Sequence, residues 1–277
     1  MAHSLDVLIA TYRRPAALAV LLASLAAQTR RDFRVVVSDQ TEDASAYAAG
    51  EVRAGLRVLA AHGHDIETHR HLPRRGIAEQ RQFLLERARS PCALFLDDDL
   101  ILESDVIATL ARALRELGCG FVGQAVIGLS YVDDVRPHEQ AIEFWDGPVR
   151  PETVTPESPA WARHRLHNAA NLYHVQRRLA LAPGSYRAYR VAWIGGCVLY
   201  DTAKLRAAGG FGFWRELPSS HCGEDALAQL RVMARFGGCG VVPSGVYHQE
   251  LPTTLADRRV NAPHVLSVDA GVRHGAG

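Results

Sequence analysis

At residues 93–99 the chain reads Ala93-Leu94-Phe95-Leu96-Asp97-Asp98-Asp99, a short apolar run followed directly by three aspartates. An apolar run of this length is typical of a buried central strand. Ligands bind at the carboxyl ends of strands in open α/β sheets. Mg²⁺ is usually held there by one or two carboxylates together with substrate phosphates. The stretch therefore predicts a cation site for a phosphate-bearing ligand, although such acids also cap helices or lie in solvent.

Strand and helix signals alternate through the first half of the chain. Apolar or β-branched runs predict strands at residues 6–11, 33–38, 66–69, 93–96 and 121–127. The stretches between them predict helices at residues 15–27, 45–61, 77–88 and 104–117. Such alternation predicts an α/β fold with a mainly parallel, Rossmann-like sheet and helices on both faces.

The alternation stops after Gly128. Residues 129–190 are rich in Pro, His, Arg and Trp and show little periodicity. A structureless loop of that length is improbable inside a compact domain, so we expect short irregular elements that form a side region or lid. Order returns with a strand predicted at 191–200, helices at 202–208 and 225–236, and a last strand at 240–242, whereas residues 256–277 have little pattern.

The composition argues against several classes of protein. The 277 residues, 48% of them hydrophobic, suffice for one large α/β domain or two small ones. A formal net charge of +1 gives no electrostatic reason to expect nucleic acid or an anionic membrane as a partner. No apolar stretch approaches the ~18–20 residues of a membrane helix, and the N-terminus lacks the features of a signal peptide. The five cysteines form no C-x-x-C pair, so we expect a reduced, cytoplasmic chain.

Two other predicted strands should end beside the aspartates, because parallel strands share one carboxyl edge. The first ends in Thr11-Tyr12-Arg13-Arg14-Pro15 and the second in Ser38-Asp39-Gln40. A nucleotide could lie across this edge, with its base near Thr11 and Asp39 and its phosphates near the metal. The chain has no Walker loop and no G-x-G-x-x-G after the first strand, which argues against the P-loop and dinucleotide-binding classes.

Three further positions could belong to the same site. Arg81 follows a helix start and could bind an anion, or it could be a surface arginine. Glu224 and Asp225 begin a helix, where acids also occur as caps. His248 lies near the end of the patterned region and could join a metal site that already holds aspartates, although a lone histidine is more often structural.

Five sequence motifs, quoted at the end of this paragraph in the order in which they follow one another along the chain, resemble those of the family 2 glycosyltransferases, which have the glycosyltransferase A fold. The resemblance covers about residues 5–128 and 191–252. The sequence departs from the family pattern at Arg13, Gln40 and Gln82, which stand where Asn, an acid and Asn are usual. The motifs are Thr11-Tyr12-Arg13-Arg14-Pro15, Val36-Val37-Ser38-Asp39-Gln40-Thr41, Gly76-Ile77-Ala78 with Arg81, Asp97-Asp98-Asp99, and Gly195-Gly196 with Gly223-Glu224-Asp225.

The resemblance implies transfer of a sugar, with inversion, from a nucleotide-diphosphate sugar to an acceptor hydroxyl. The donor is expected to be a UDP-sugar, and Mn²⁺ or Mg²⁺ is the implied cofactor. Residues 1–128 would form the donor half and residues 129–255 the acceptor-side and catalytic half. The implied roles are nucleotide binding by Thr11, Tyr12, Arg14, Asp39, Arg81, Asp97 and Asp98, metal binding by Asp99 and His248, and catalysis by Asp225 as general base with Glu224 in support.

Two other classes of protein remain as alternatives. A sugar-nucleotide nucleotidyltransferase also combines a parallel sheet with metal-binding acids, but it usually has a glycine-rich loop after the first strand, and residues 11–15 contain no glycine. A non-catalytic nucleotide-sugar-binding module would be favoured by loss of Asp99 or of Glu224 and Asp225, and all three are present. The acceptor, whether a glycan, a lipid-linked molecule or a small molecule, and the oligomeric state are not determined by the sequence.

Overall fold

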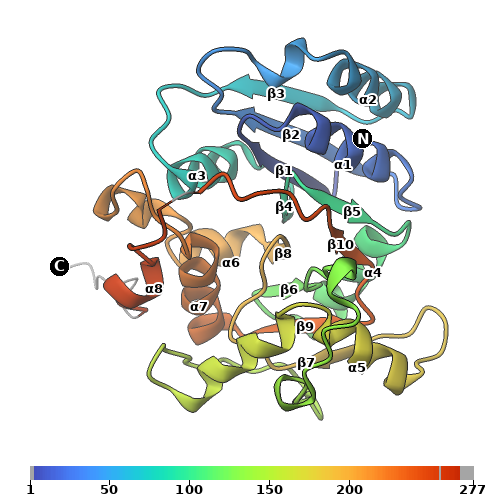
Figure 1. Cartoon of the computed structure of the whole chain (residues 1–277), viewed down its shortest axis with the longest axis vertical. Helices are drawn as coiled ribbons and strands as arrows, with labels where there is room; N and C mark the ends of the chain where they lie inside the picture. Colours follow the sequence, from blue (N-terminus) through green and yellow to red (C-terminus); the bar gives the residue numbers. More distant parts are fainter. Residues whose placement is uncertain (1–2, 256, 269–277) are drawn as a thin grey trace.

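The computed structural model describes residues 3–255 and 257–268. Within them, eight strands form one sheet in the order β3-β2-β1-β4-β8-β6-β9-β7, and two further strands, β5 and β10, form a small second sheet (Figure 1). The strands are β1 (Leu5–Thr11), β2 (Phe33–Asp39), β3 (Ile66–Arg70), β4 (Cys92–Asp97), β5 (Leu100–Leu102), β6 (Phe121–Gly123), β7 (Arg187–Tyr189), β8 (Cys197–Asp201), β9 (Gly238–Val242) and β10 (Val246–His248).

The large sheet is mostly parallel, as predicted. Strands β3, β2, β1 and β4 are parallel neighbours, and β6 is parallel to β9. Strand β8 lies between β4 and β6 and is antiparallel to both. The insertion of β8 brings the Gly195-Gly196 turn to the carboxyl end of β4, where the amide of Asp97 donates to the carbonyl of Gly196 at 2.9 Å.

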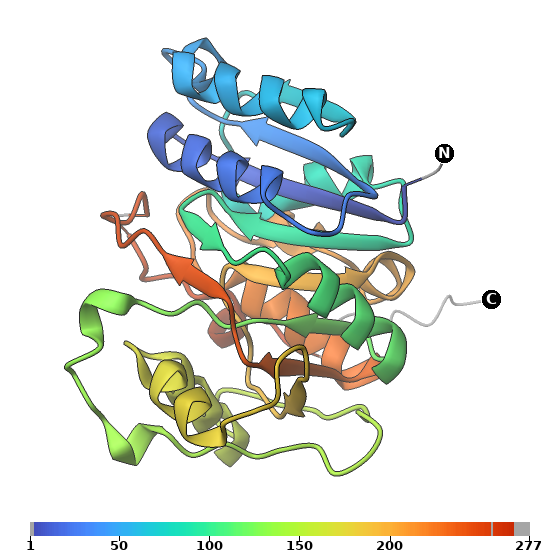
Figure 2. The same ribbon diagram turned by 90° about the vertical axis from the view of Figure 1, so that its right-hand side faces the viewer.

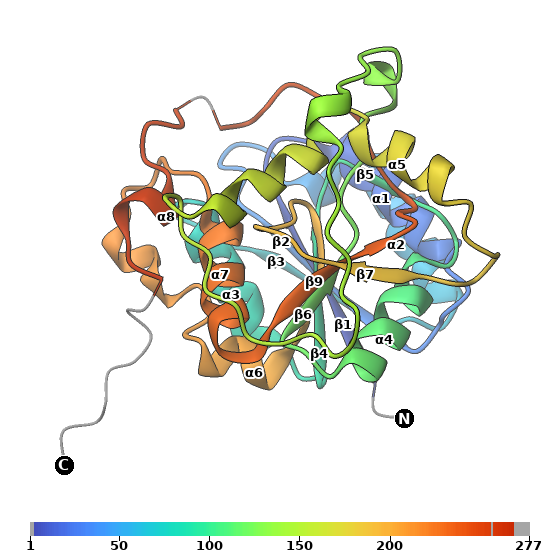
Figure 3. The ribbon, with the colours of Figure 1, turned by 90° about the horizontal axis from the view of Figure 1, so that it is seen from below.

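Helices cover both faces of the sheet (Figure 3). One face packs against α1 (Pro15–Ala26), α2 (Gly50–Ala61) and α4 (Val106–Leu117), and the other against α3 (Ile77–Arg87), α6 (Thr202–Ala207) and α7 (Glu224–Phe236). Alternate strand residues supply the two cores, since Val7 and Ile9 belong to the first and Leu8 to the second. None of the helices in the described ranges is long and apolar enough to cross a membrane.

Residues 129–190 form short elements, as expected, at the end of the sheet opposite α2 and β3 (Figure 2). The sequence analysis missed the one regular helix and the strand among them, although Leu172, Val175 and Leu179 have the spacing of one buried helix face. The elements are η2 (Leu129–Tyr131), η3 (Pro137–Glu139), η4 (Pro159–His167), α5 (Asn171–Leu179) and β7.

Several predicted boundaries are wrong for local reasons. The strand expected at 191–200 is confined to β8, because Gly196 has a φ of +79° and turns the chain. The helix expected at 45–61 is divided into η1 (Ala46–Ala48) and α2 by the extended residue Ala49. The strand expected at 121–127 ends at Gly123. Helix α8 (Ala262–Val265) lies in the stretch expected to have little pattern, of which residues 256 and 269–277 lie outside the described residues.

The carboxyl ends of the central parallel strands meet at one edge, as predicted. Thr11 is in register with Asp39, and Ala10 with Asp97. Strand β10, which the sequence analysis did not predict, pairs with β5 and places His248 opposite Leu100, directly after the aspartates. Residues 249–255, which we call the strap, then run from β10 across this edge toward α3 and α8 (Figure 1).

Candidate functional site

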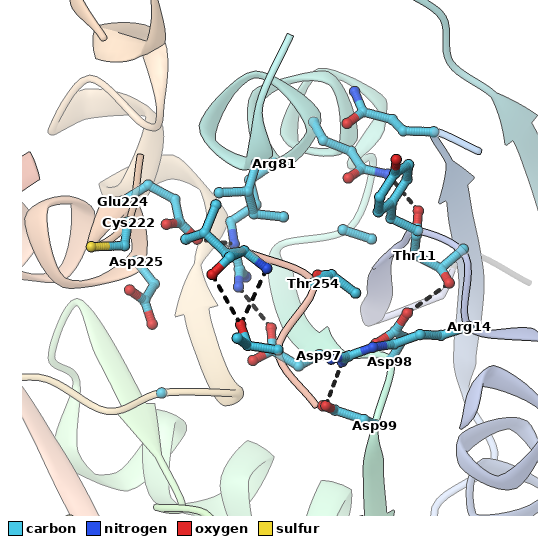
Figure 4. A pocket seen from close by; sticks show the side chains of 18 of the residues that line it. Thr11, Arg14, Arg81, Asp97, Asp98, Asp99, Cys222, Glu224, Asp225 and Thr254 are labelled. Atoms are coloured by element: carbon cyan, nitrogen blue, oxygen red, sulfur yellow. Dashed lines mark hydrogen bonds and ion pairs between the residues drawn. The ribbon is translucent and has the colours of Figure 1, made fainter. Parts of the chain in front are cut away.

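A cavity of about 560 Å³ lies at this edge, between the ends of β1 and β4, the starts of α3 and α7, and the strap. Almost all of the residues predicted for the site line it, and several of them point toward one another across it (Figure 4). The predicted residues in the lining are Thr11, Tyr12, Arg14, Arg81, Asp97, Asp98, Asp99, Glu224, Asp225 and His248.

Asp39 is the exception. Its side chain is fully buried, and its carboxylate accepts hydrogen bonds from the amides of Thr41 at 2.9 Å and Ala46 at 2.7 Å and from the Ser45 hydroxyl at 3.1 Å. Aspartate side chains commonly bond nearby backbone amides in this way. Asp39 is thus not among the residues that line the cavity, and in this structure its carboxylate holds the loop that follows β2, so its contact with a base stays a prediction. The adjacent Gln40 lines the cavity instead.

Arg81 is a buried ion-pair partner and not a surface arginine. Its Nε donates to Glu224 at 2.9 Å, and a terminal nitrogen donates to Asp97 at 2.7 Å. The exposed fractions of the Arg81 and Glu224 side chains are only 8% and 7%. Glu224 is thus held by Arg81, and the start of α7 is fixed to α3 and to the end of β4.

Asp225 follows Glu224 but faces the cavity. Its Oδ1 accepts from the amide of Ala226 at 2.8 Å, and no donor in the described part of the chain contacts its Oδ2. A Cβ on Gly195 would lie 3.9 Å from this Oδ2, so the free oxygen lies beside the turn before β8. Burial and the charge of Glu224 together raise the pKa of Asp225 to about 7, against the lowering effect of Arg81. The structure therefore distinguishes the two acids, which the sequence left open.

Gly223 is required at the start of α7. It adopts a φ of +74°, and a Cβ at this position would lie 2.1 Å from Oδ1 of Asn261. The left-handed conformation and the close approach both favour glycine. This turn points the consecutive Glu224 and Asp225 in different directions, one to Arg81 and one to the cavity (Figure 4).

The three aspartates have different surroundings. Asp97 pairs with Arg81 and keeps 44% of its side chain exposed. Asp98 is buried and accepts a hydrogen bond from the Thr11 hydroxyl at 2.7 Å. Burial and the charge of Asp99 together raise the pKa of Asp98 to about 7, against the lowering effect of the Thr11 hydrogen bond. Asp99 is also buried and bonds to Arg14 at 2.6 Å.

Asp99 and His248 are the predicted metal ligands. The Oδ2 of Asp99 lies 3.4 Å from Nε2 of His248, so one ion could contact both atoms. A carboxylate with an imidazole suits a divalent cation that takes its remaining ligands from a diphosphate. The donor set therefore fits, although residues 3–255 and 257–268 contain no ready group of three or more such ligands. Two contacts must be released before an ion can bind these atoms. The first is the bond from Arg14 to Oδ2 of Asp99. The second is the 2.6 Å bond that Nδ1 of His248 accepts from the Glu250 amide, because it leaves the proton of a neutral ring on Nε2, the atom that would bind the ion.

Some lining residues were not among the candidate site residues of the sequence analysis. Arg74 stacks on the Tyr12 ring, with its guanidinium carbon 4.0 Å from the ring centre. The strap contributes Leu251, Thr253, Thr254 and Leu255 to the lining, and it is fixed by the bond from the Gln249 amide to the Asp99 carbonyl at 2.8 Å. These residues come from stretches without periodicity, so only the three-dimensional structure brings them to the site.

The fold and this acid-lined cavity are those of a glycosyltransferase of the A fold. The chain belongs to glycosyl transferase family 2, whose family model matches residues 6–194. The family and fold predicted from the sequence are thereby confirmed, and the prediction of a glycosyltransferase is confirmed at the level of the family. A search of curated proteins gave no match.

Three solved structures illustrate the likeness of fold. GalNAc-T7 with UDP, GalNAc and Mn²⁺ is 14% identical, with a TM-score of 0.57 over 89% of this chain and 44% of that chain. Residues 1–349 of S. aureus TarS in complex with UDP-GlcNAc are 15% identical, with a TM-score of 0.51 over 91% of this chain and 60% of that chain. The mannosyltransferase PcManGT from Pyrobaculum calidifontis in complex with GDP-Man and Mn²⁺ is 15% identical, with a TM-score of 0.51 over 87% and 57%. This chain thus spans about half the length of the solved structures that it matches.

Proposed function

We propose that this chain is an inverting glycosyltransferase that moves a sugar from a nucleotide-diphosphate sugar, a UDP-sugar in the first instance, to an acceptor hydroxyl. The observation that carries the proposal is the free Oδ2 of Asp225, which faces the same cavity as the three aspartates. An inverting transfer needs one base near the acceptor and a separate charged site near the diphosphate. This cavity offers both.

The donor nucleotide would lie along the strand ends. Thr11 lies on one side of the cavity and Arg81 on another (Figure 4), and Tyr12 and Asp97 also belong to its lining. The base would lie toward Thr11, Tyr12 and Gln40, and the half-exposed carboxylate of Asp97 is available to ribose hydroxyls. The structures of TarS with UDP-GlcNAc and of GalNAc-T7 with UDP support a uridine donor, whereas PcManGT with GDP-Man keeps a guanosine donor as the alternative to test.

The diphosphate would lie beside Asp98 and Asp99. Asp99 and His248 would hold Mn²⁺ or Mg²⁺ there, and the Mn²⁺ bound to PcManGT and GalNAc-T7 supports this cofactor. A divalent ion at this point neutralises the charge that develops on a leaving diphosphate. Asp98, held by the Thr11 hydroxyl, fixes the turn that presents Asp99.

Asp225 would act on the acceptor. Its ionised carboxylate takes the proton of the acceptor hydroxyl while that oxygen forms a bond to the anomeric carbon. The bond from the anomeric carbon to the diphosphate oxygen breaks at the same time, and the electron pair leaves with the diphosphate. General base catalysis of this kind contributes typically ~10²–10⁴-fold. The buried pair of Glu224 and Arg81 keeps the turn that carries Asp225 in place.

The metal role of Asp99 predicts that D99A loses the part of UDP affinity that depends on Mn²⁺. Titration calorimetry with UDP, in the presence and absence of Mn²⁺, measures this part directly. D105A is the matched control, because Asp105 is an exposed aspartate outside the cavity. Equal enhancement of UDP affinity by Mn²⁺ in D99A and in the wild type would refute the assignment.

We expect transferase activity to depend on pH near neutrality, because the pKa of the proposed base, Asp225, is raised from 3.8 to about 7. Above about pH 7 Asp225 is ionised and can accept the proton, and below it the carboxyl is protonated and inactive. The value of kcat/KM should therefore fall as the pH is lowered through about 7. An initial-rate profile that stays flat down to about pH 5 would contradict this prediction.

Nucleotide release separates this function from the alternatives. With Mn²⁺ and no acceptor, a glycosyltransferase should slowly hydrolyse its nucleotide-sugar to the nucleoside diphosphate and free sugar. A nucleotidyltransferase would instead release pyrophosphate from a nucleoside triphosphate and a sugar phosphate, and a binding module would release nothing.

The same proposal includes a cytoplasmic location and an acceptor that is a glycan, a lipid-linked molecule or a small molecule. Nucleic acid is not proposed as a partner.

A further inference from the structure

Arg14 lies where a cation is needed. It precedes α1 at the end of β1 and points toward the aspartates (Figure 4). One terminal nitrogen lies 2.6 Å from Oδ2 of Asp99 and 3.5 Å from Oδ1 of Asp98, and the other donates to the carbonyl of Pro252 in the strap. The exposed fraction of the Arg14 side chain is 15%. A nearly buried guanidinium thus balances two buried carboxylates.

The Arg14 bond and the proposed metal site depend on the same atom. Oδ2 of Asp99 is the oxygen that Arg14 contacts, and it is also the oxygen 3.4 Å from Nε2 of His248. A guanidinium cannot lose its proton in a protein and cannot act as a metal ligand. Arg14 and a divalent ion at this oxygen would also repel each other in a poorly solvated site. The two cations therefore exclude each other in this arrangement of side chains.

A nucleoside diphosphate changes this competition. Guanidinium groups bind the oxygens of phosphates, as they bind those of carboxylates, in a bidentate manner. Arg14 lines the cavity beside the strand ends, so a diphosphate next to Asp98 and Asp99 comes within its reach. Movement of the guanidinium to the diphosphate leaves Oδ2 of Asp99 available to the divalent ion.

We propose that Arg14 is an internal cation that closes the metal site of the donor-free protein, and that a nucleoside diphosphate opens the site by drawing Arg14 away from Asp99. The inference rests on the proposed function and adds a regulatory link between its two ligands. Metal and nucleotide then bind cooperatively, and the coupling depends on Arg14. Because such coupling is reciprocal, the diphosphate raises the affinity for the metal by the same factor by which the metal raises the affinity for the diphosphate.

The test compares R14Q with the wild type in binding of Mn²⁺ alone, UDP alone and both together. We expect R14Q to bind Mn²⁺ alone ~10-fold or more tighter than the wild type, within the usual range of allosteric coupling. Binding of UDP without metal should be weaker in R14Q, and the factor by which UDP enhances Mn²⁺ binding should fall toward one. Calorimetry measures all three quantities, and the electron paramagnetic resonance signal of free Mn²⁺ gives an independent value.

R13Q is the matched control. Arg13 is the next residue and carries the same charge, but it is exposed and its side chain lies 3.5 Å from Glu42 and Asp43, away from the three aspartates. Binding of Mn²⁺ and UDP should be unchanged in R13Q. If R14Q does not fold, R14K replaces it, because lysine retains the charge without the planar fork of arginine. R14K should bind Mn²⁺ more tightly and UDP more weakly than the wild type, both to a smaller extent than expected for R14Q.

The results separate the inference from the function on which it rests. General damage to the site would weaken both ligands, whereas the inference requires a gain for Mn²⁺ and a loss for UDP. Folded R14Q that binds Mn²⁺ no more tightly than the wild type would overturn the role of Arg14 while leaving the transferase proposal intact. Failure of the wild type to bind either UDP or GDP, with or without Mn²⁺, would instead overturn the proposed function itself.

Discussion

D225N is expected to lose ~10²-fold or more of kcat while it keeps near-normal affinity for the nucleotide-sugar. The amide cannot accept the proton of the acceptor hydroxyl, and this interaction exists mainly in the transition state. The substitution keeps the size of the side chain and an oxygen that can accept from the amide of Ala226, so the start of α7 should be preserved. Steady-state kinetics give kcat, and calorimetry gives the affinity for the donor.

E224Q is the matched comparison, because it removes the neighbouring charge without removing the base. The charge of Glu224 raises the pKa of Asp225, so its loss should shift the acid limb of kcat/KM to lower pH. The variant should remain active, although the ion pair with Arg81 is weakened to a hydrogen bond between the charged guanidinium and a neutral amide. An active D225N together with an inactive E224Q would reverse the roles, and activity in both with no shift of the limb would place the base elsewhere.

R81M is expected to lower the free energy of unfolding by about 3–5 kcal/mol at neutral pH, because removal of one partner leaves a buried charge uncompensated. Arg81 is the partner of both Glu224 and Asp97. Without Arg81, the buried carboxylate of Glu224 loses the charge that lowers its pKa, so its folded-state pKa rises and protonation relieves the unpaired charge. The loss of stability should therefore shrink as the pH falls from about 8 to about 5, because the folded variant then takes up protons.

R87M controls for the loss of an arginine from the same helix. Arg87 lies in the last turn of α3, donates to the carbonyl of Phe83 and stacks on its ring, and no described carboxylate pairs with it. Its replacement at this half-buried position should cost about 1 kcal/mol, in line with the loss of one hydrogen bond and no charge left unpaired. Denaturant unfolding of both variants at the two pH values measures the difference. Equal destabilisation by R81M and R87M, or a loss in R81M that does not depend on pH, would contradict the ion-pair account.

The part of the site that the sequence predicted follows from strand periodicity. Short apolar runs that end in Thr11 and in Asp97 define parallel strands, and parallel strands end at one edge. The three aspartates, the histidine at the end of β10 and the two acids of α7 then meet in one cavity because each lies in or next to an element whose place in the fold is fixed.

The remainder depends on contacts between segments that are distant in sequence. The sequence predicted Asp39 at a strand end, but it did not reveal that the loop after it folds back and occupies its carboxylate. The different surroundings of Glu224 and Asp225 depend on the position of Arg81 on another helix. The bond from Arg14 to the strap likewise joins residues that are 238 positions apart. No local pattern contains this information.

Release of UDP from a UDP-sugar is the most direct test of the central claim. The wild-type protein would be incubated with UDP-sugars and Mn²⁺ without an acceptor, beside D99A and D225N, and free nucleotide would be quantified over time. We predict slow release of UDP from at least one UDP-sugar by the wild type, with no enhancement by Mn²⁺ in D99A and a strong reduction in D225N. Absence of UDP release from every UDP-sugar, or equal release by the wild type and both variants, would contradict the account.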